Sequence, residues 1–342
     1  NPIIWAILIT SLSTSTIITM TSHHWLLAWL GLELNTLSML PIIMKPHHPR
    51  ATEATTKYFL VQALAAATIL LASTMNAWQT GHWTITNSTT TTIITLAIML
   101  KLGVAPIHLW YPEVIQGTTL NTALLISTWQ KLAPMTLLYM MHNNLPTNLL
   151  VSAGLMSALA GGWAGLNQTQ TRKIMAHSSI AHMGWLMVAM ALSPQLTTLT
   201  LLIYMTTTTA MFISLNNSTS KTITDMGTTW SSSPSMTTMT LLTLTSLGGL
   251  PPLTGFMPKL LILNELTTNS MIPLATTLAL ASLPSLFFYI RMAYMTTLTT
   301  PPNTTNTEYK WRFKTTLTQN PSMTTTLALM LLPLTTTLYA AT

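Results

Sequence analysis

The stretch Ile93-Ile94-Thr95-Leu96-Ala97-Ile98-Met99-Leu100-Lys101-Leu102-Gly103 decides the fold class, because it is apolar apart from one threonine and one lysine. Lys131 and Lys259 lie in two further stretches of the same kind. A lysine at the centre of a bilayer costs roughly 2.5–3.5 kcal/mol on insertion scales, whereas a folded protein is stable by only about 5–15 kcal/mol. Charged residues at that depth usually serve a function, most often the movement of charge.

The composition indicates that lipid is the main solvent of this chain. Its 342 residues are 49% hydrophobic and only 6% charged, whereas soluble domains carry about 25% charged residues. The net charge is +7, but the basic residues stand singly between apolar stretches and form no basic face, which excludes nucleic acid as a partner. The chain has no cysteine, which excludes disulfides and thiolate ligation of iron–sulfur clusters or haem.

Apolar stretches of about 20 residues predict eleven membrane-spanning helices. They cover residues 2–20, 25–44, 58–77, 91–112, 119–141, 145–166, 174–192, 196–215, 236–264, 271–295 and 322–340. The polar segments 216–235 and 296–320 are predicted to be loops, and no separate soluble domain fits. We therefore expect an all-α, polytopic membrane protein that forms a single membrane domain over residues 1–342.

The basic residues predict the orientation of these spans. Three of the 13 Lys and Arg residues lie deep inside spans, and the other ten all lie after even-numbered spans or, for Arg291, at the end of the tenth span. These ten are Lys45, Arg50, Lys57, Arg172, Lys173, Lys221, Arg291, Lys310, Arg312 and Lys314. The positive-inside rule then places the even loops and the N-terminus on the interior side, and the C-terminus outside.

An internal repeat predicts two broken helices. The pattern G-x-x-P-x5-P followed by a charged residue occurs at Gly103, Pro106, Pro112 and Glu113 and again, 146 residues later, at Gly249, Pro252, Pro258 and Lys259. Proline removes a helix donor and glycine adds flexibility, so both spans are expected to break near mid-membrane.

Matched interrupted helices are typical of transport sites in inverted repeats. Because the two patterns lie five spans apart, the repeats, about 1–141 and 145–295, should be related by inversion, with an extra C-terminal helix at about 322–340. The alternative is that proline and glycine are simply common in membrane helices, although this does not explain the matched spacing.

Five ionisable residues suit a proton relay: Glu33, Lys101, Lys131, Lys259 and His182. Burial disfavours the charged form of an amine while a nearby carboxylate favours it, and histidine titrates near neutral pH. We expect Glu33 and Lys101 to approach within direct or one-water contact, and Lys131 to be the central carrier. The alternatives are a buried ion pair that fixes helix packing and a hydrogen-bonded core histidine.

Several segments resemble the chain 2 family of NADH–ubiquinone oxidoreductase, the mitochondrially encoded, antiporter-like subunits of respiratory complex I. The resemblance covers essentially the whole chain and is most specific in Leu166–Gln170, Ser178–Trp185 and Gly248–Lys259. Pro49–Ala54, Met99–Gly103, Trp129–Pro134 and Gly161–Trp163 are similar as well. His177 and the stretch Pro106–Trp110 depart from the usual family pattern.

The resemblance implies a multi-pass subunit of the mitochondrial inner membrane, with its N-terminus on the matrix side and its C-terminus on the intermembrane-space side. It implies two inverted five-helix bundles, in which Glu33 and Lys101 match the family's Glu–Lys pair, Lys131 its central lysine and Lys259 the lysine of the second broken helix. Expected partners are other membrane-arm and accessory subunits, including neighbouring antiporter-like subunits, and lipids. No cofactor is expected in this chain, because NADH, flavin, iron–sulfur clusters and ubiquinone would bind elsewhere in the complex.

Three functions remain open at this stage. The first is a proton-translocating subunit of NADH:ubiquinone oxidoreductase, enzymatic only as part of that complex. The second is a cation/proton antiporter that works on its own gradient. The third is a structural membrane scaffold whose lysines serve packing.

Overall fold

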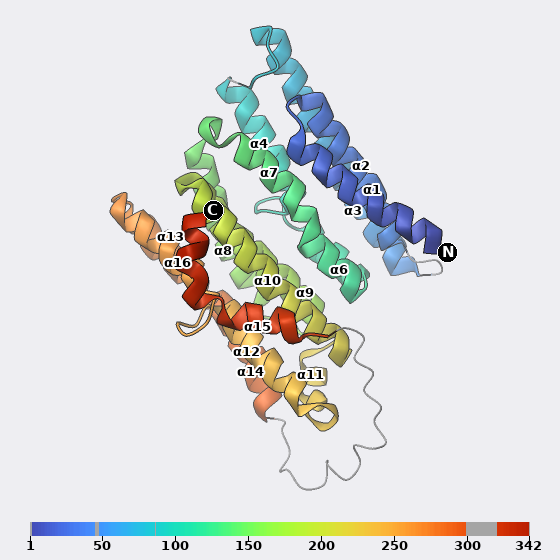
Figure 1. Cartoon of the computed structure of the whole chain (residues 1–342), viewed down its shortest axis with the longest axis vertical. Helices are drawn as coiled ribbons and strands as arrows, with labels where there is room; N and C mark the ends of the chain where they lie inside the picture. Colours follow the sequence, from blue (N-terminus) through green and yellow to red (C-terminus); the bar gives the residue numbers. More distant parts are fainter. Residues whose placement is uncertain (1, 45–47, 86, 299–319, 342) are drawn as a thin grey trace. The chain divides into compact units, whose positions relative to one another are not determined.

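Helices account for the regular structure of the described chain, which in this computed structural model comprises all residues except 1, 45–47, 86, 299–319 and 342. These residues contain no strand and one isolated β-bridge, between Gln170 and Thr222. They form two units, Asn1–Ser157 and Ala158–Thr342 (Figure 1). The predicted all-α fold class is confirmed.

The first unit is organised around α3. Its elements are α1 (Pro2–Thr21), α2 (Trp25–Ile43), α3 (Pro49–Thr80), α4 (Ser88–Leu102), α5 (Trp110–Gly117), α6 (Leu120–Ser127), η1 (Trp129–Lys131), α7 (Leu132–Met140), η2 (His142–Asn144) and the beginning of α8 (Thr147–Gly165). Helix α3 packs against α2, α4 and α5, while α7 packs against α1, α2 and α4.

The second unit is organised around α10 and α14. It contains the end of α8, α9 (Thr171–Leu192), α10 (Pro194–Ser218), α11 (Ile223–Ser232), α12 (Pro234–Gly248), α13 (Phe256–Thr268), α14 (Ile272–Leu298), α15 (Ser322–Met330), η4 (Leu332–Leu334) and α16 (Thr335–Ala341). Helix α10 packs against α9, α12, α13 and α15, and α14 packs against α9, α11, α12 and α13.

Every predicted span contains a helix or a pair of helices at the expected place. Six helices of the described chain, α1, α2, α3, α9, α10 and α14, are long and apolar enough to cross a membrane. Helix α3 begins at Pro49 rather than at residue 58, so its first turns include Arg50, Glu53 and Lys57. The number of eleven crossings stays a prediction.

The predicted loop 216–235 is wrong in part, because α11 lies inside it. The Thr222 hydroxyl accepts a hydrogen bond from the Asp225 N–H at 3.3 Å, and the Asp225 carboxylate accepts one from the Thr222 N–H at 2.9 Å. This capping box satisfies donors that the first turn of a helix leaves unpaired. Residues 299–319 of the other predicted loop lie outside the described residues.

Close packing of α8 on α9 holds the part of α9 that carries His182. A Cβ atom at Gly161 would lie 2.6 Å from the Ala181 backbone nitrogen, so only glycine fits there. The end of α8 is fixed as well, because Arg291 of α14 donates a hydrogen bond to the Leu166 carbonyl at 2.8 Å.

Candidate functional site

Both predicted broken spans are interrupted. In each, the residue that follows the last helical residue is a glycine in the left-handed conformation. Helix α4 ends at Leu102, and Gly103 has φ +72°. Helix α12 ends at Gly248, and Gly249 has φ +79°. Glycine adopts this conformation without the strain that a Cβ atom adds, which is why it commonly ends helices.

The two breaks share one hydrogen-bond pattern at a spacing of 146 residues. In each, the glycine N–H donates to the carbonyl three residues earlier, and the next N–H donates to the carbonyl five residues earlier, at 3.0–3.3 Å. The donors are Gly103, Val104, Gly249 and Leu250, and the acceptors are Leu100, Met99, Ser246 and Thr245. Helices α4 and α12 are both 15 residues long. The repeat read from glycine and proline spacing is therefore also a repeat of backbone structure.

The prolines of the repeat begin the second half-helices. Pro112 and Pro258 lie in the first turn of α5 and of α13, where backbone N–H groups have no helical partner. Pro106 and Pro252 lie in the segments that connect the half-helices. Proline therefore sets where the chain resumes a helix, and glycine sets where it leaves one.

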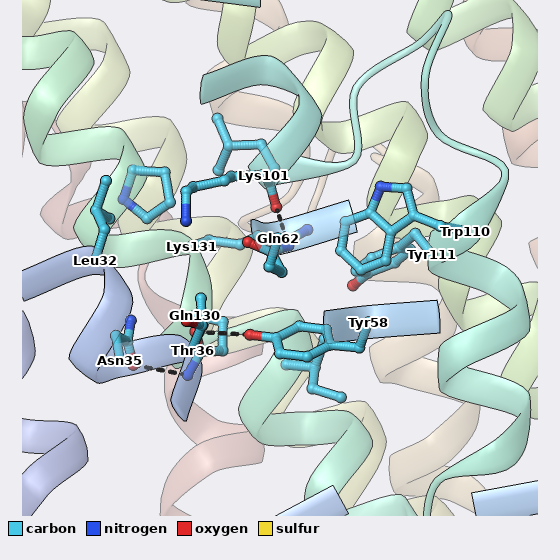
Figure 2. Close-up of a pocket in the computed structure, with 13 residues that line it drawn as sticks. Leu32, Asn35, Thr36, Tyr58, Gln62, Lys101, Trp110, Tyr111, Gln130 and Lys131 are labelled. Carbon is cyan, nitrogen blue, oxygen red and sulfur yellow. Dashed lines mark hydrogen bonds between the residues drawn. The ribbon is translucent and has the colours of Figure 1, made fainter. Parts of the chain in front are cut away.

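In the first unit, Lys101 and Lys131 line one cavity of about 20 Å³ (Figure 2). Both are buried, with exposed fractions of 6% and 2%. Residues of several helices complete the wall: Leu32, Asn35, Thr36, Tyr58, Gln62, Leu102, Trp110, Tyr111, Ile126, Gln130 and Pro134. The volume is sufficient for about one or two water molecules.

A further break, which the sequence did not predict, places Lys131 at this cavity. The fifth span consists of α6, the 3-10 turn η1 and α7, with Lys131 at the junction of η1 and α7. Pro134 has no N–H and cannot donate to the carbonyl four residues earlier. The Lys131 N–H donates to the carbonyl of Thr128, three residues earlier, at 3.2 Å, which is the spacing of a 3-10 turn.

Side-chain amides form a polar network around the two lysines. Gln130 donates to the Asn35 side chain at 3.0 Å and accepts from the Tyr58 hydroxyl at 3.4 Å. Gln62 donates at 3.3 Å to the Lys101 carbonyl, close to the end of α4. Sequence reasoning missed these amides, although an amide inside an apolar span is itself a signal of a buried polar network.

The predicted Glu33–Lys101 pair forms no direct ion pair. Lys101 Nζ has no hydrogen-bond partner among the described residues, and Glu33 accepts a hydrogen bond from Thr36 of its own helix at 3.0 Å. Glu33 is close enough to act on Lys101 electrostatically, and contact through one water stays a prediction. Lys131 Nζ lies 5.2 Å from the centre of the Tyr111 ring, at cation–π distance.

In the second unit, Lys259 and His182 line a cavity of about 30 Å³ together with Trp185, Tyr204 and Ser246. Lys259 Nζ donates at 2.9 Å to the Gly248 carbonyl, which the break leaves without a helical partner. The lysine lies so close over Gly249 that a Cβ atom there would be 2.9 Å from Nζ. His182 Nε2 lies 3.3 Å from the Tyr289 hydroxyl.

Glu113 occupies the position of Lys259 in the first repeat but lies at the surface. Its carboxylate is 2.6 Å from Lys57 Nζ, which is also 2.5 Å from Glu53. The side chains of all three are at least 38% exposed. This cluster links α5 to the beginning of α3, outside the cavity that holds the buried lysines.

Matches to known sequences identify the family of this chain. Residues 22–285 match the model "NADH:quinone oxidoreductase/Mrp antiporter, TM", and residues 286–339 match "NADH dehydrogenase subunit 2 C-terminus". The chain is 53% identical to NADH-ubiquinone oxidoreductase chain 2 of Carassius auratus over 98% of its own length and 97% of that protein. The chain belongs to the NADH–ubiquinone oxidoreductase chain 2 family. Chain 2 of Xenopus laevis is 51% identical over 97% of this chain and 96% of that one.

Solved structures show that the fold is shared more widely than the chain 2 family. A chain of respiratory complex I from Thermus thermophilus superposes with a TM-score of 0.80 at 23% identity, over 95% of this chain and 78% of that chain. A chain of the Mrp complex from Dietzia sp. DQ12-45-1b superposes with a TM-score of 0.75 at 16% identity, over 83% of this chain and 59% of that one. At these identities the likeness is one of fold.

Proposed function

We propose that this chain is a core membrane subunit of proton-translocating NADH:ubiquinone oxidoreductase, respiratory complex I. It contributes an antiporter-like proton pathway, and other subunits transfer the electrons from NADH to ubiquinone. The observation that carries this proposal is the pairing of each helix break with a polar cavity that contains a lysine: Lys101 and Lys131 in the first unit, Lys259 in the second. Membership of the chain 2 family supports it.

The five residues of the relay divide into two roles in the proposal. Lys101, Lys131, Lys259 and His182 take up and release protons, and Glu33 tunes Lys101 through its charge. Lysine suits this role because burial disfavours its ammonium form, so that small changes in nearby charge shift its proton occupancy. Water-sized cavities beside the breaks supply the transfer steps between side chains.

The proposed setting is the mitochondrial inner membrane, with the N-terminus on the matrix side and the C-terminus on the intermembrane-space side. The two repeats, residues 1–141 and 145–295, are related by inversion because five spans separate them. Moving one proton outward against 100 mV costs about 2.3 kcal/mol. Redox subunits of the complex supply this energy, and neighbouring antiporter-like subunits, accessory subunits and lipids are the partners of the chain.

Replacement of Lys131 by Met tests the proposal, because Met keeps the bulk of the side chain and removes the charge. The purified complex carrying Lys131→Met, reconstituted into vesicles, should assemble and oxidise NADH with a lowered proton-to-electron ratio. Lys221→Met removes an exposed lysine and serves as the control. Normal pumping by the assembled Lys131→Met complex would show that this lysine carries no protons.

A further inference from the structure

Helix α15 ends beside the second helix break. A carbonyl in its last turn accepts no hydrogen bond from its own helix. Helix α15 stops at Met330, and the 3-10 turn η4 that follows contains Pro333, which has no N–H. Carbonyls in the last turn of a helix have no partner within it. Ala328 belongs to that turn and is fully buried, so its carbonyl needs donors from elsewhere.

Two hydroxyls donate to the Ala328 carbonyl from opposite sides of the break. Ser246, in the last turn of α12, donates at 3.2 Å, and Thr254, in the segment before α13, also donates. All three residues have an exposed fraction of 0%. A single carbonyl of α15 therefore holds the chain both before and after Gly249.

The junction formed by Ser246, Thr254 and the Ala328 carbonyl lies next to the groups that bind Lys259. Ser246 lines the same cavity as Lys259, and the Gly248 carbonyl that accepts the lysine hydrogen bond is two residues further along the chain. Gly255, next to Thr254, lies so close to the Ser246 carbonyl that no Cβ atom fits between them. A shift of either hydroxyl would therefore move the break that presents the Gly248 carbonyl.

Among the described residues, the first repeat shows no equivalent of this junction. Leu100 and His108 stand 146 residues before Ser246 and Thr254, and neither carries a hydroxyl. The first break uses Gln62 of α3, which donates to the Lys101 carbonyl at 3.3 Å. Helix α15 also lies in the segment that matches the separate C-terminal family model, whereas both hydroxyls lie in the antiporter segment.

We propose that Ser246 and Thr254 are positioning residues that fasten the second helix break to α15 and so fix the carbonyl to which Lys259 binds. The proposal rests on the proposed function of Lys259 as a proton carrier. Loss of the two hydroxyls loosens the break, and Lys259 then loses its fixed hydrogen bond. Proton transfer through Lys259 consequently acquires a different pH dependence.

The test uses the assembled complex with Ser246→Ala and Thr254→Val, singly and together. Thr254→Ser keeps the hydroxyl and is the rescue variant. Thr240→Val is the matched control, because Thr240 is a buried residue of α12 whose hydroxyl donates, among the described residues, to the Thr237 carbonyl of its own helix and not to α15. The measurements are hydrogen exchange of the backbone amides of residues 249–257 and the pH profile of the proton-to-electron ratio in vesicles.

We expect exchange in residues 249–257 to rise about tenfold in the double variant, since two hydrogen bonds are lost, and the pH profile to shift. Thr254→Ser and Thr240→Val should behave as the unchanged complex does. Unchanged exchange in the double variant would overturn the junction, and raised exchange with an unchanged pH profile would overturn its positioning role. Lys259→Met is measured in parallel: normal pumping by that variant overturns the proton-carrier role, whatever the exchange data show.

Discussion

At the residue scale, the most unusual group of the first unit is the Lys101 ammonium. Buried polar groups are nearly always hydrogen-bonded, because an unpaired one keeps its full desolvation penalty. Lys101 Nζ has no such partner within the described part of the chain. Lys101 instead lines a cavity with room for about one or two waters, which suits an amine that exchanges protons with water better than a fixed structural ion pair does.

Glu33→Gln separates the charge of Glu33 from its hydrogen bond. The amide oxygen of Gln still accepts from Thr36, as Glu33 does at 3.0 Å, while the negative charge that acts on Lys101 disappears. We expect normal assembly and a lowered proton-to-electron ratio. The double variant with Lys101→Met should pump no worse than Lys101→Met alone, because both changes remove the same interaction. Additive losses in the double variant would contradict this coupling.

Sequence reasoning found the charged residues of the site but missed their neutral partners. Lys101, Lys131 and Lys259 stand out because a charge in an apolar stretch is costly wherever it points. Gln62 and Gln130 do not stand out, because an amide in a membrane helix can face a cavity, a neighbouring helix or a loop. Only the packing of α3 against the end of α4 shows that Gln62 reaches a backbone carbonyl there.

At the element scale, the glycine that ends α12 meets two requirements that only glycine meets together: a left-handed backbone and room for the Lys259 side chain. Gly249 has φ +79°, and Lys259 lies directly over its Cα atom. Gly81, which ends α3, has φ +74° but has no atom within 4 Å of the site of a Cβ atom. The two positions share a left-handed backbone conformation and differ in their surroundings.

Alanine at these two positions should therefore have different effects. Both Gly249→Ala and Gly81→Ala add left-handed strain of roughly 1–2 kcal/mol, but only Gly249→Ala displaces the Lys259 side chain. We expect both complexes to assemble, and Gly249→Ala alone to change the proton-to-electron ratio. Equal effects of the two changes on pumping would mean that strain, not the lysine contact, matters at the break.

The capping box of α11 makes this helix sensitive to acid. The backbone and hydroxyl of Thr222 hold the pKa of the Asp225 carboxyl below its usual value. Because the pKa of Asp225 is lower in the folded than in the unfolded chain, its ionised carboxylate stabilises the helix at pH values above the unfolded pKa. This stabilisation is lost as pH falls through the folded pKa. Asp225→Asn should thus speed hydrogen exchange in residues 223–232 at neutral pH, with the difference from the unchanged complex disappearing in acid. A difference that persists in strong acid would exclude this carboxylate as its origin.

Element boundaries were predictable where one signal dominated. The breaks of α4 and α12 followed from the repeated glycine, because few residues tolerate a left-handed turn. The break at η1 was missed, since Pro134 alone does not distinguish a kink from the start of a new helix. Helix α11 was missed because the sequence was searched for apolar stretches of about 20 residues, whereas this short helix has only Ile223, Met226 and Trp230 at helical spacing. Its capping box was the other available signal.

At the scale of the whole molecule, the lack of cysteine makes the predicted orientation directly testable. His82 lies between α3 and α4, Lys221 lies between α10 and α11, and both are exposed. In His82→Cys and Lys221→Cys, the new thiol is the only one in the chain. A membrane-impermeant maleimide should label residue 82 only from the intermembrane-space side and residue 221 only from the matrix side. Labelling of both from the same side would refute the alternation of loops and the inversion of the repeats.

The small size of the two lysine cavities has a consequence for ion selectivity. At about 20 and 30 Å³, each has room for roughly one or two waters, far fewer than surround a sodium or potassium ion in solution. Such a cation would have to shed most of its hydration shell, and the lysines that line the cavities would repel it. A proton avoids both obstacles, because it hops between a water and an amine without carrying a shell. The volume and the charge of these two cavities therefore both favour passage of a proton over passage of a metal cation.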